Sequence, residues 1–190
     1  MATRLIEEYR AQGRRPPNLL VCGTPGTGKT SLCEELAQRT GWTHIDISAL
    51  ALRRQLHEGY DDSRQTHILD EDAVLDELDD ANQVNIMQGG FIVDYHGCDF
   101  FPERFFDLVL ILRAENNILW ERLEARGYPQ TKVQENVEAE IMQVVLEEAR
   151  ESYKHEIIQE LPSNTLDDHE ANLERISQWL LAHMEQAPRV

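Results

Sequence analysis

The chain has 190 residues, of which 41% are hydrophobic and 28% charged, which is typical of one globular domain and excludes long-range disorder. With 35 acidic and 18 basic residues, the net charge of −17 argues against direct, sequence-specific nucleic-acid binding and favours a basic protein as partner. No apolar run approaches the ~18 residues of a membrane span, no secretory signal is recognisable, and the three cysteines form no CxxC pair, which together predict no membrane contact and a reduced compartment.

In chain order, residues 1–17 are interpreted as an N-terminal extension with one short amphipathic turn of helix, expected to be a partly mobile arm. Residues 18–187 follow as one domain. Apolar strands are predicted near 18–22, 43–46, 91–94, 108–112 and 157–161, and helices up to residue 40 and at 48–58, 70–78, 115–125, 133–154 and 171–184, with a loop at 60–69. Strands that are apolar throughout and alternate with helices predict a three-layer α/β fold around a parallel sheet.

The most specific local motif is a phosphate-binding loop. Residues Gly23–Thr30 (GTPGTGKT) match the pattern GxxxxGK[ST] in full, between a predicted strand and a predicted helix. Backbone N–H groups of such a loop form an anion nest, and the helix N-terminus adds positive charge. Lys29 is expected to bridge the β- and γ-phosphates of ATP, Thr30 to bind Mg²⁺ and Ser31 to reach the α-phosphate. The alternative is a glycine-rich turn without a ligand, which does not explain why a strand precedes the motif and a helix follows it.

A second candidate site lies at the end of the strand 91–94. Asp94 closes this apolar strand at the position where a Walker-B aspartate holds Mg²⁺. His96 follows two residues later and is a candidate for orienting a water molecule or an acceptor hydroxyl. The alternatives are that Asp94 only caps the strand and that His96 has a purely structural role in its loop. The histidines show no HxxxH or HExxH spacing, which argues against a zinc site.

Phosphoryl transfer also needs cations around the moving group. Arg126 precedes two helix breakers, Gly127 and Pro129, as in a mobile lid. Arg104 is expected at the carboxyl edge of the sheet, and Arg53 in the helix after the second strand, where an acceptor nucleotide could dock. Each of the three is otherwise a solvated surface charge.

These residues resemble the isoenzyme 6 branch of the adenylate kinases, also called coilin-interacting nuclear ATPases. The resemblance covers residues 18–184, and its most specific stretch is Ile92–Arg104 (IVDYHGCDFFPER). Other matching pieces are Gly23–Thr30, Ile68–Asp72, Asp76–Asp79, Glu121–Glu124, Arg126–Tyr128 and Leu161–Asn164. The chain departs from the expected pattern at Leu50–Gln55, and residues 81–88 look like a short insertion.

The resemblance implies a P-loop NTPase fold with a five-stranded parallel sheet, a nucleoside monophosphate (NMP) binding region near 46–69 and a short lid near 125–135. It implies the reaction ATP + AMP ⇌ 2 ADP with Mg²⁺, a slow ATPase, and action in the nucleus and cytoplasm. It also implies help in late maturation of the small ribosomal subunit, through a small-subunit ribosomal protein of the uS11 type.

Carried over by position, the resemblance assigns ATP binding to Gly26, Gly28, Lys29, Thr30, Ser31, Arg126 and Thr165, and hydrolysis to Asp94 and His96. The residues themselves add Gly23 and Thr27 to the ATP-binding loop, Lys29 and Arg126 to catalysis, Thr30 and Asp94 as Mg²⁺ ligands, and Arg53 and Arg104 as candidates for AMP binding. Two functions stay open. One is an adenylate kinase; the other is an ATPase switch in ribosome assembly that binds a basic ribosomal protein, with AMP transfer incidental.

Overall fold

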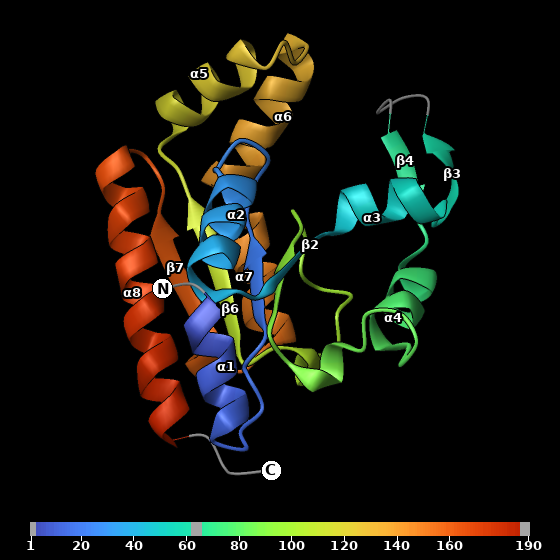
Figure 1. Cartoon of the computed structure of the whole chain (residues 1–190). Helices are drawn as coiled ribbons and strands as arrows, with labels where there is room; N and C mark the ends of the chain where they lie inside the picture. The colour runs from blue at the N-terminus through green and yellow to red at the C-terminus, as the bar shows by residue number, and fades with distance from the viewer. Residues whose placement is uncertain (1–2, 62–65, 187–190) are drawn as a thin grey trace.

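A computed structural model describes residues 3–61 and 66–186. Its centre is a five-stranded sheet with strand order β2-β5-β1-β6-β7 and parallel pairing throughout, which confirms the predicted fold (Figure 1). The strands are β1 (Leu19–Cys22), β2 (Thr43–Asp46), β5 (Phe91–Asp94), β6 (Leu108–Arg113) and β7 (Ile158–Pro162).

Both faces of the sheet are buried, which explains the uniformly apolar strands. In β1, Leu19 and Val21 belong to one core cluster, while Leu20 and Cys22 belong to the other. Successive side chains of a strand point to opposite faces, so a strand covered on both sides needs an apolar residue at every position.

Helices pack on both faces of the sheet (Figure 1). One face packs against α1 (Thr3–Ala11), α2 (Lys29–Thr40) and α8 (Leu166–Gln186). The other packs against α3 (Ile47–Arg54), α4 (Glu71–Asp79) and α7 (Val144–Ser152). Three short 3₁₀ turns, Ile86–Gln88, Glu103–Phe105 and His155–Ile157, lead into strands β5, β6 and β7. None of the helices described is both long and apolar enough to cross a membrane.

Two further helices form a small lobe above the carboxyl ends of the strands (Figure 1). These are α5 (Asn116–Ala125) and α6 (Gln130–Ile141), which share their own apolar cluster, including Leu119, Leu123 and Val133. Gly127, with φ +73°, turns the chain between them. The predicted helix breakers therefore lie where the chain reverses.

Four predicted elements differ from the structure, although residues 62–65 of the expected loop lie outside the described residues. The helix expected at 48–58 ends at Arg54, because Gln55 adopts a left-handed conformation (φ 58°) and caps it. The expected loop at 60–69 is instead an antiparallel pair, β3 (His57–Asp61) and β4 (Thr66–Leu69). The long helix expected at 133–154 is interrupted, because Gln143 has φ 58° and separates α6 from α7. The last helix begins earlier than expected, at Leu166.

The N-terminal segment is part of the core. Tyr9 is fully buried, and its hydroxyl donates to the carbonyl oxygen of Leu180 on α8 at 2.7 Å. Arg15 forms two hydrogen bonds to the Asp107 carboxylate, at 2.9 and 3.0 Å. The expectation of a partly mobile arm is therefore wrong for the described residues of this segment.

Candidate active site

The phosphate-binding loop leaves β1 and enters α2, as its motif requires. Gly23 has φ +147°, and a Cβ there would lie 2.6 Å from the carbonyl oxygen of Leu112 on the neighbouring strand β6. Gly28, with φ +89°, occupies the N-cap position of α2. Only glycine meets both conditions without strain, so these two residues set the path of the loop.

Lys29 lies folded over this loop. Its Nζ donates to the carbonyl oxygens of Gly23 at 2.8 Å and Thr24 at 3.3 Å. Burial lowers the pKa of Lys29, and the nearby Asp94 carboxylate opposes that shift. The ammonium group therefore stands at the mouth of the anion nest, with the loop carbonyls as its partners in this structure.

Thr30 and Asp94 meet at the carboxyl end of the sheet. The hydroxyl of Thr30 donates to Oδ2 of Asp94 at 2.7 Å, and Asp94 is only 4% exposed. Asp46, at the end of the adjacent strand β2, is in register with Asp94 and caps α3 through the backbone N–H of Ala49. Hydroxyl and carboxylate oxygens are the donors that Mg²⁺ prefers, so this pair fits the ion.

These groups line a cavity of about 240 Å³, called here the phosphate pocket. Its walls come from the loop, the ends of β2 and β5, and the α5–α6 turn. The lining residues are Pro25, Gly26, Gly28, Lys29, Thr30, Ser31, Asp46, Ser48, Asp94, Tyr95, His96, Arg126 and Tyr128. The structure thus brings Arg126 to the loop from the lobe, as the sequence predicts for a lid arginine.

His96 lines both the phosphate pocket and the larger cavity beside it. Desolvation inside the pocket lowers the pKa of His96, and the positive charge of Lys29 lowers it further. A neutral imidazole can accept a proton from a water molecule or hydroxyl, which is the property that a general base needs.

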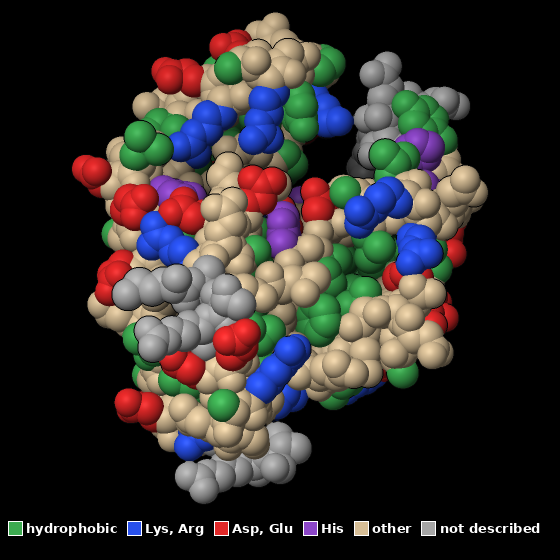
Figure 2. Space-filling model, in the orientation of Figure 1, with side chains coloured by type: hydrophobic (Ala, Val, Ile, Leu, Met, Phe, Trp, Pro, Cys, Tyr) green, Lys and Arg blue, Asp and Glu red, His purple; other side chains and the backbone are tan. Residues whose placement is uncertain are grey.

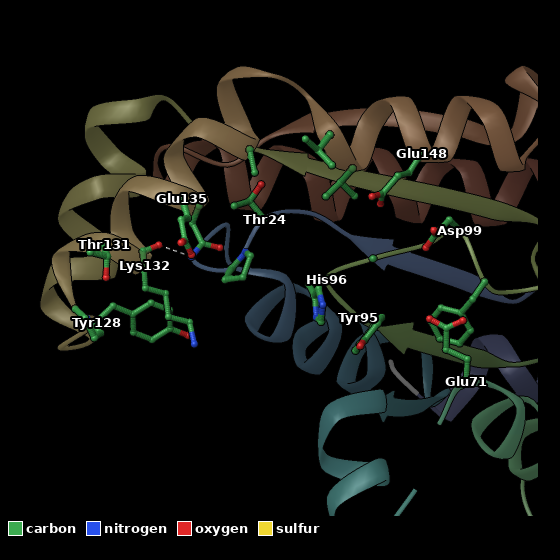
Figure 3. Close-up of a pocket in the computed structure, with 18 residues that line it drawn as sticks. Thr24, Glu71, Tyr95, His96, Asp99, Tyr128, Thr131, Lys132, Glu135 and Glu148 are labelled. Atoms are coloured by element: carbon green, nitrogen blue, oxygen red, sulfur yellow. Dashed lines mark hydrogen bonds between the residues drawn. The ribbon is translucent and has the colours of Figure 1, made fainter. Parts of the chain in front are cut away.

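The larger cavity has a volume of about 800 Å³ and is called here the acidic cleft. Four carboxylates line it, from Glu71, Asp99, Glu135 and Glu148, against one basic side chain, Lys132. Figure 3 shows His96 between Lys132 and Glu135 on one side and the other three carboxylates on the other. Figure 2 shows the surface hollowed between the α5–α6 lobe and the β3–β4 hairpin.

Two of these carboxylates are electrostatically perturbed. Desolvation raises the pKa of Glu71 and that of Glu148, and in both cases the negative charge of Asp99 adds to the shift. The cleft therefore concentrates negative charge, against which Lys132 is the one lysine or arginine among its lining residues.

A buried network joins the phosphate-binding loop to the lobe. Glu140, on the last turn of α6, accepts a 2.5 Å hydrogen bond from the hydroxyl of Thr24. Its other carboxylate oxygen accepts from Nε of Arg113 at 2.6 Å and from the N–H of Ala114 at 3.2 Å. Glu140 is 3% exposed, so α6 is fixed to the loop through a desolvated ion pair.

A second arginine, Arg122 of α5, holds the loop that follows β7. It donates to the carbonyl oxygens of Ser163 at 2.7 Å and Asn164 at 3.0 Å. The hydroxyl of Ser163 in turn donates to the carbonyl oxygen of Thr27 at 2.6 Å. The β7–α8 loop is thereby attached to the phosphate-binding loop.

Five predicted site residues line neither cavity: Gly23 and Thr27, which are buried within the phosphate-binding loop, and Arg53, Arg104 and Thr165. Thr165 sits at the start of α8, where its hydroxyl accepts from the N–H of Asp168 at 3.1 Å. Arg53 is exposed near the end of α3. Neither lines the phosphate pocket or the acidic cleft as described.

The prediction for Arg104 is wrong in position. The connection that contains it leads into the amino end of β6, where Asn18 donates to the carbonyl oxygen of the neighbouring Phe105 at 2.9 Å. Arg104 itself lies 3.6 Å from Asp79 and over the ring of Phe105. Arg104 therefore lies at the opposite end of the sheet from Lys29 and is no longer a candidate for AMP binding.

Sequence reasoning missed Thr24, Asp46, Arg122 and Glu140 as site residues. Asp46 had a usable signal, because it ends a predicted strand next to the one that ends at Asp94. Glu140 had none, because 116 residues separate it from Thr24 along the chain.

Comparisons with known proteins identify the fold and the family of this chain. A family model described as "AAA domain" matches residues 19–143. Among solved structures, shikimate kinase from Acinetobacter baumannii in complex with shikimate superposes with a TM-score of 0.62 at 16% identity, covering 92% of this chain and 97% of that one. At that identity the likeness shows the fold alone.

Curated relatives are much more similar in sequence. The adenylate kinase isoenzyme 6 homolog of Dictyostelium discoideum is 53% identical, over 88% of this chain and 93% of that protein. The homolog of Schizosaccharomyces pombe is 48% identical over the same shares, and that of Drosophila melanogaster 39% identical over 86% of this chain and 91% of its own. The chain therefore belongs to the adenylate kinase isoenzyme 6 family.

Proposed function

We propose that this protein is a nucleoside monophosphate kinase that catalyses ATP + AMP ⇌ 2 ADP and also hydrolyses ATP slowly. The observation that carries the proposal is that Lys29, Thr30 and Asp94 line the same pocket, to which the α5–α6 turn contributes Arg126. Relatives named adenylate kinase isoenzyme 6 homologs support the choice of reaction.

Each group has a distinct role in this proposal. The backbone N–H groups between Gly23 and Thr30, with Ser31, hold the ATP phosphates, while Lys29 exchanges its carbonyl partners for phosphate oxygens. Thr30 and Asp94 hold Mg²⁺, which neutralises charge on the phosphates when bound. Arg126 adds positive charge from the lid. Closure of the lid excludes water from the pocket.

The neutral imidazole of His96 orients and deprotonates the attacking group, which is water in hydrolysis and the AMP phosphate in transfer when that phosphate is protonated. Thr165 lines the adenine beyond the β7–α8 loop. We place the NMP-binding region at about 46–69 and the lid at about 125–135. Arg53 is a candidate cation for AMP, because α3 borders the phosphate pocket through Ser48.

Phosphorus NMR of the protein with Mg-ATP, with and without AMP, tests this proposal. For a kinase whose closed lid excludes water, we expect fast growth of ADP that requires AMP, above a slow background release of ADP and inorganic phosphate. If inorganic phosphate accumulates as fast as ADP and AMP does not accelerate ADP formation, the protein is an ATPase and the kinase proposal is wrong.

The acidic cleft favours a second candidate function, an ATPase switch in small ribosomal subunit maturation. Its four carboxylates and the net charge of −17 complement a basic protein, such as a small-subunit ribosomal protein of the uS11 type. This function places the protein in the nucleus and cytoplasm. A pull-down with the ribosomal protein across a salt series tests it, and binding that does not weaken with salt would contradict the electrostatic basis.

A further inference from the structure

A cluster of potential metal ligands lies behind the phosphate pocket. Cys33 on α2, His44 on β2 and Asp94 on β5 each place one ligand atom within 4.8 Å of the other two. Three segments far apart along the chain supply these ligands, so the spacing rules that argued against a zinc site do not detect them.

The fold explains why the three side chains converge. Cys33 lies one helical turn after Thr30, whose hydroxyl is bonded to Asp94, so the thiol faces the same strand end. His44 pairs in register with Ile92, two residues before Asp94, so His44 and Asp94 lie on the same face of the sheet. That is the face on which α2 packs.

One nitrogen of this cluster makes no hydrogen bond among the described residues, although it lies within ion-pair distance of a carboxylate. The Nε2 of His44 is buried without a hydrogen-bond partner among the described residues, 3.6 Å from Oδ2 of Asp94. A buried polar atom without a partner costs free energy, so its retention next to a carboxylate and a thiol points to an additional ligand there.

The donor set selects the kind of ligand. Sulfur and imidazole nitrogen favour Zn²⁺ over Mg²⁺, and a tetrahedral Zn²⁺ ion needs donor atoms about 3.3–3.8 Å apart, which small side-chain rotations would give here. Asp94 also lines the phosphate pocket, which supplies an entry path and room for a water molecule as a fourth ligand.

We propose that Cys33, His44 and Asp94 form a site for a thiophilic divalent cation, with Zn²⁺ as the occupant, and that this ion competes with Mg²⁺ for Asp94. On binding, the thiol of Cys33 releases its proton to solvent and coordinates as a thiolate, with no change of redox state. Because Asp94 cannot serve both ions, Zn²⁺ inhibits phosphoryl transfer and hydrolysis. Only this inhibition rests on the proposed function.

Binding is tested with Co²⁺ as a spectroscopic probe, on the full chain without nucleotide. The expected result is one bound Co²⁺ with a thiolate-to-cobalt charge-transfer band and tetrahedral d–d bands, displaced by added Zn²⁺. Cys33→Ala should abolish the charge-transfer band and weaken Zn²⁺ binding by about 10-fold or more. This readout requires no catalysis, so its failure is distinguishable from failure of the proposed function.

Two further variants complete the design. Cys98→Ala, at an equally buried cysteine outside the cluster, should keep both the band and the affinity. His44→Phe removes the unpaired nitrogen at similar volume, so it should fold while losing affinity by about 10-fold or more. The absence of the band in the unaltered protein, or its persistence in Cys33→Ala, would overturn the site.

The activity measurement then tests competition. Zn²⁺ added at fixed ATP should inhibit the unaltered protein, less so as Mg²⁺ is raised, and Cys33→Ala should need about 10-fold more Zn²⁺. If Zn²⁺ inhibits both proteins at the same concentration, it acts by replacing the Mg²⁺ bound to the nucleotide. That result would overturn the regulatory part of the proposal.

Discussion

Lys29 must change partners before it can act. Its ammonium group donates to two carbonyl oxygens of the phosphate-binding loop, and burial lowers its pKa. Arrival of an anionic phosphate supplies a stronger, charge-assisted partner in the same place. The loop is thus formed before nucleotide binds, and binding replaces existing hydrogen bonds.

Lys29→Ala is therefore expected to lower both ATP hydrolysis and AMP phosphorylation by about 100-fold or more, because it removes charge aimed at the transferring phosphoryl group. A coupled assay of ADP production measures this. Lys154→Ala is the matched control, since this exposed lysine pairs with Glu103 outside both cavities. Unchanged turnover in Lys29→Ala would remove the loop from the mechanism.

Substitution of His96 is expected to affect the rate of hydrolysis but not the affinity for ATP. His96→Ala should slow hydrolysis by about 100-fold and leave the Kd for ATP nearly unchanged, because the imidazole acts on the attacking group. Nucleotide fluorescence titration and phosphate release measure the two quantities. His155→Ala, at an exposed histidine outside both cavities, serves as control. If hydrolysis persists in His96→Ala, the residue is structural.

At this scale the sequence predicts residues that are contiguous in a motif or that end a strand. Asp94, Arg126 and most of Gly23–Ser31 line the phosphate pocket. The three exceptions in the loop are Gly23 and Thr27, which are buried, and Thr24, which lines the acidic cleft. Arg104 was misplaced because an arginine between two strands can lie at either edge of the sheet, and only the path of the chain decides which.

Helices and strands with a strong hydrophobic periodicity were predicted well. Helix ends that depend on the backbone conformation of a single residue were not. Gln55 and Gln143 both adopt φ 58°, and each ends or interrupts a helix that its apolar pattern would extend. Glutamine is not a typical residue for this conformation, so neither break was visible in the sequence. The β3–β4 hairpin was missed because its residues are largely exposed and lack an apolar run.

The α6 helix depends on its buried ion pair. Glu140→Ala leaves the buried Thr24 hydroxyl and Ala114 N–H without their acceptor, while Arg113 keeps only Glu160, 3.6 Å away, as a carboxylate partner. We expect it to destabilise the protein by about 1–3 kcal/mol in urea denaturation. Glu138→Ala, an exposed neighbour on the same helix, should change stability by less than about 0.5 kcal/mol. Equal effects of the two substitutions would show that the network does not form.

The α1 helix is expected to be a structural element of the domain. Tyr9→Ala removes a fully buried ring and its hydrogen bond to Leu180, and should cost about 3–5 kcal/mol of unfolding free energy. Glu7→Ala, on the exposed side of the same helix, is the control. A stability unchanged by Tyr9→Ala would restore the interpretation of this segment as an appendage.

Over the whole molecule, charge distribution separates the two candidate functions. The net charge of −17 and the acidic cleft oppose approach of AMP, whose phosphate is negative, while they attract a basic protein. The phosphate-binding loop holds ATP despite this field, because its N–H groups act at short range. The sequence predicted the acidity but not its concentration in a cleft, since Glu71, Asp99 and Glu148 come from different elements.

Neutralising part of the cleft should therefore move the two functions in opposite directions. The double variant Glu71→Gln, Glu148→Gln is expected to weaken binding of a basic ribosomal protein at low salt and to lower the KM for AMP. The control Glu174→Gln, Glu185→Gln alters the charge equally on α8, across the sheet. Isothermal titration and AMP kinetics measure the two effects.

The same carboxylates give this prediction a pH dependence. Desolvation raises the pKa of Glu71 and of Glu148, so both become protonated at a higher pH than ordinary glutamates. Lowering the pH from neutrality removes their negative charge first, so affinity for a basic protein should fall with pH, and less steeply in the double variant than in the control. Equal slopes in the two proteins would show that the partner binds elsewhere on the acidic surface.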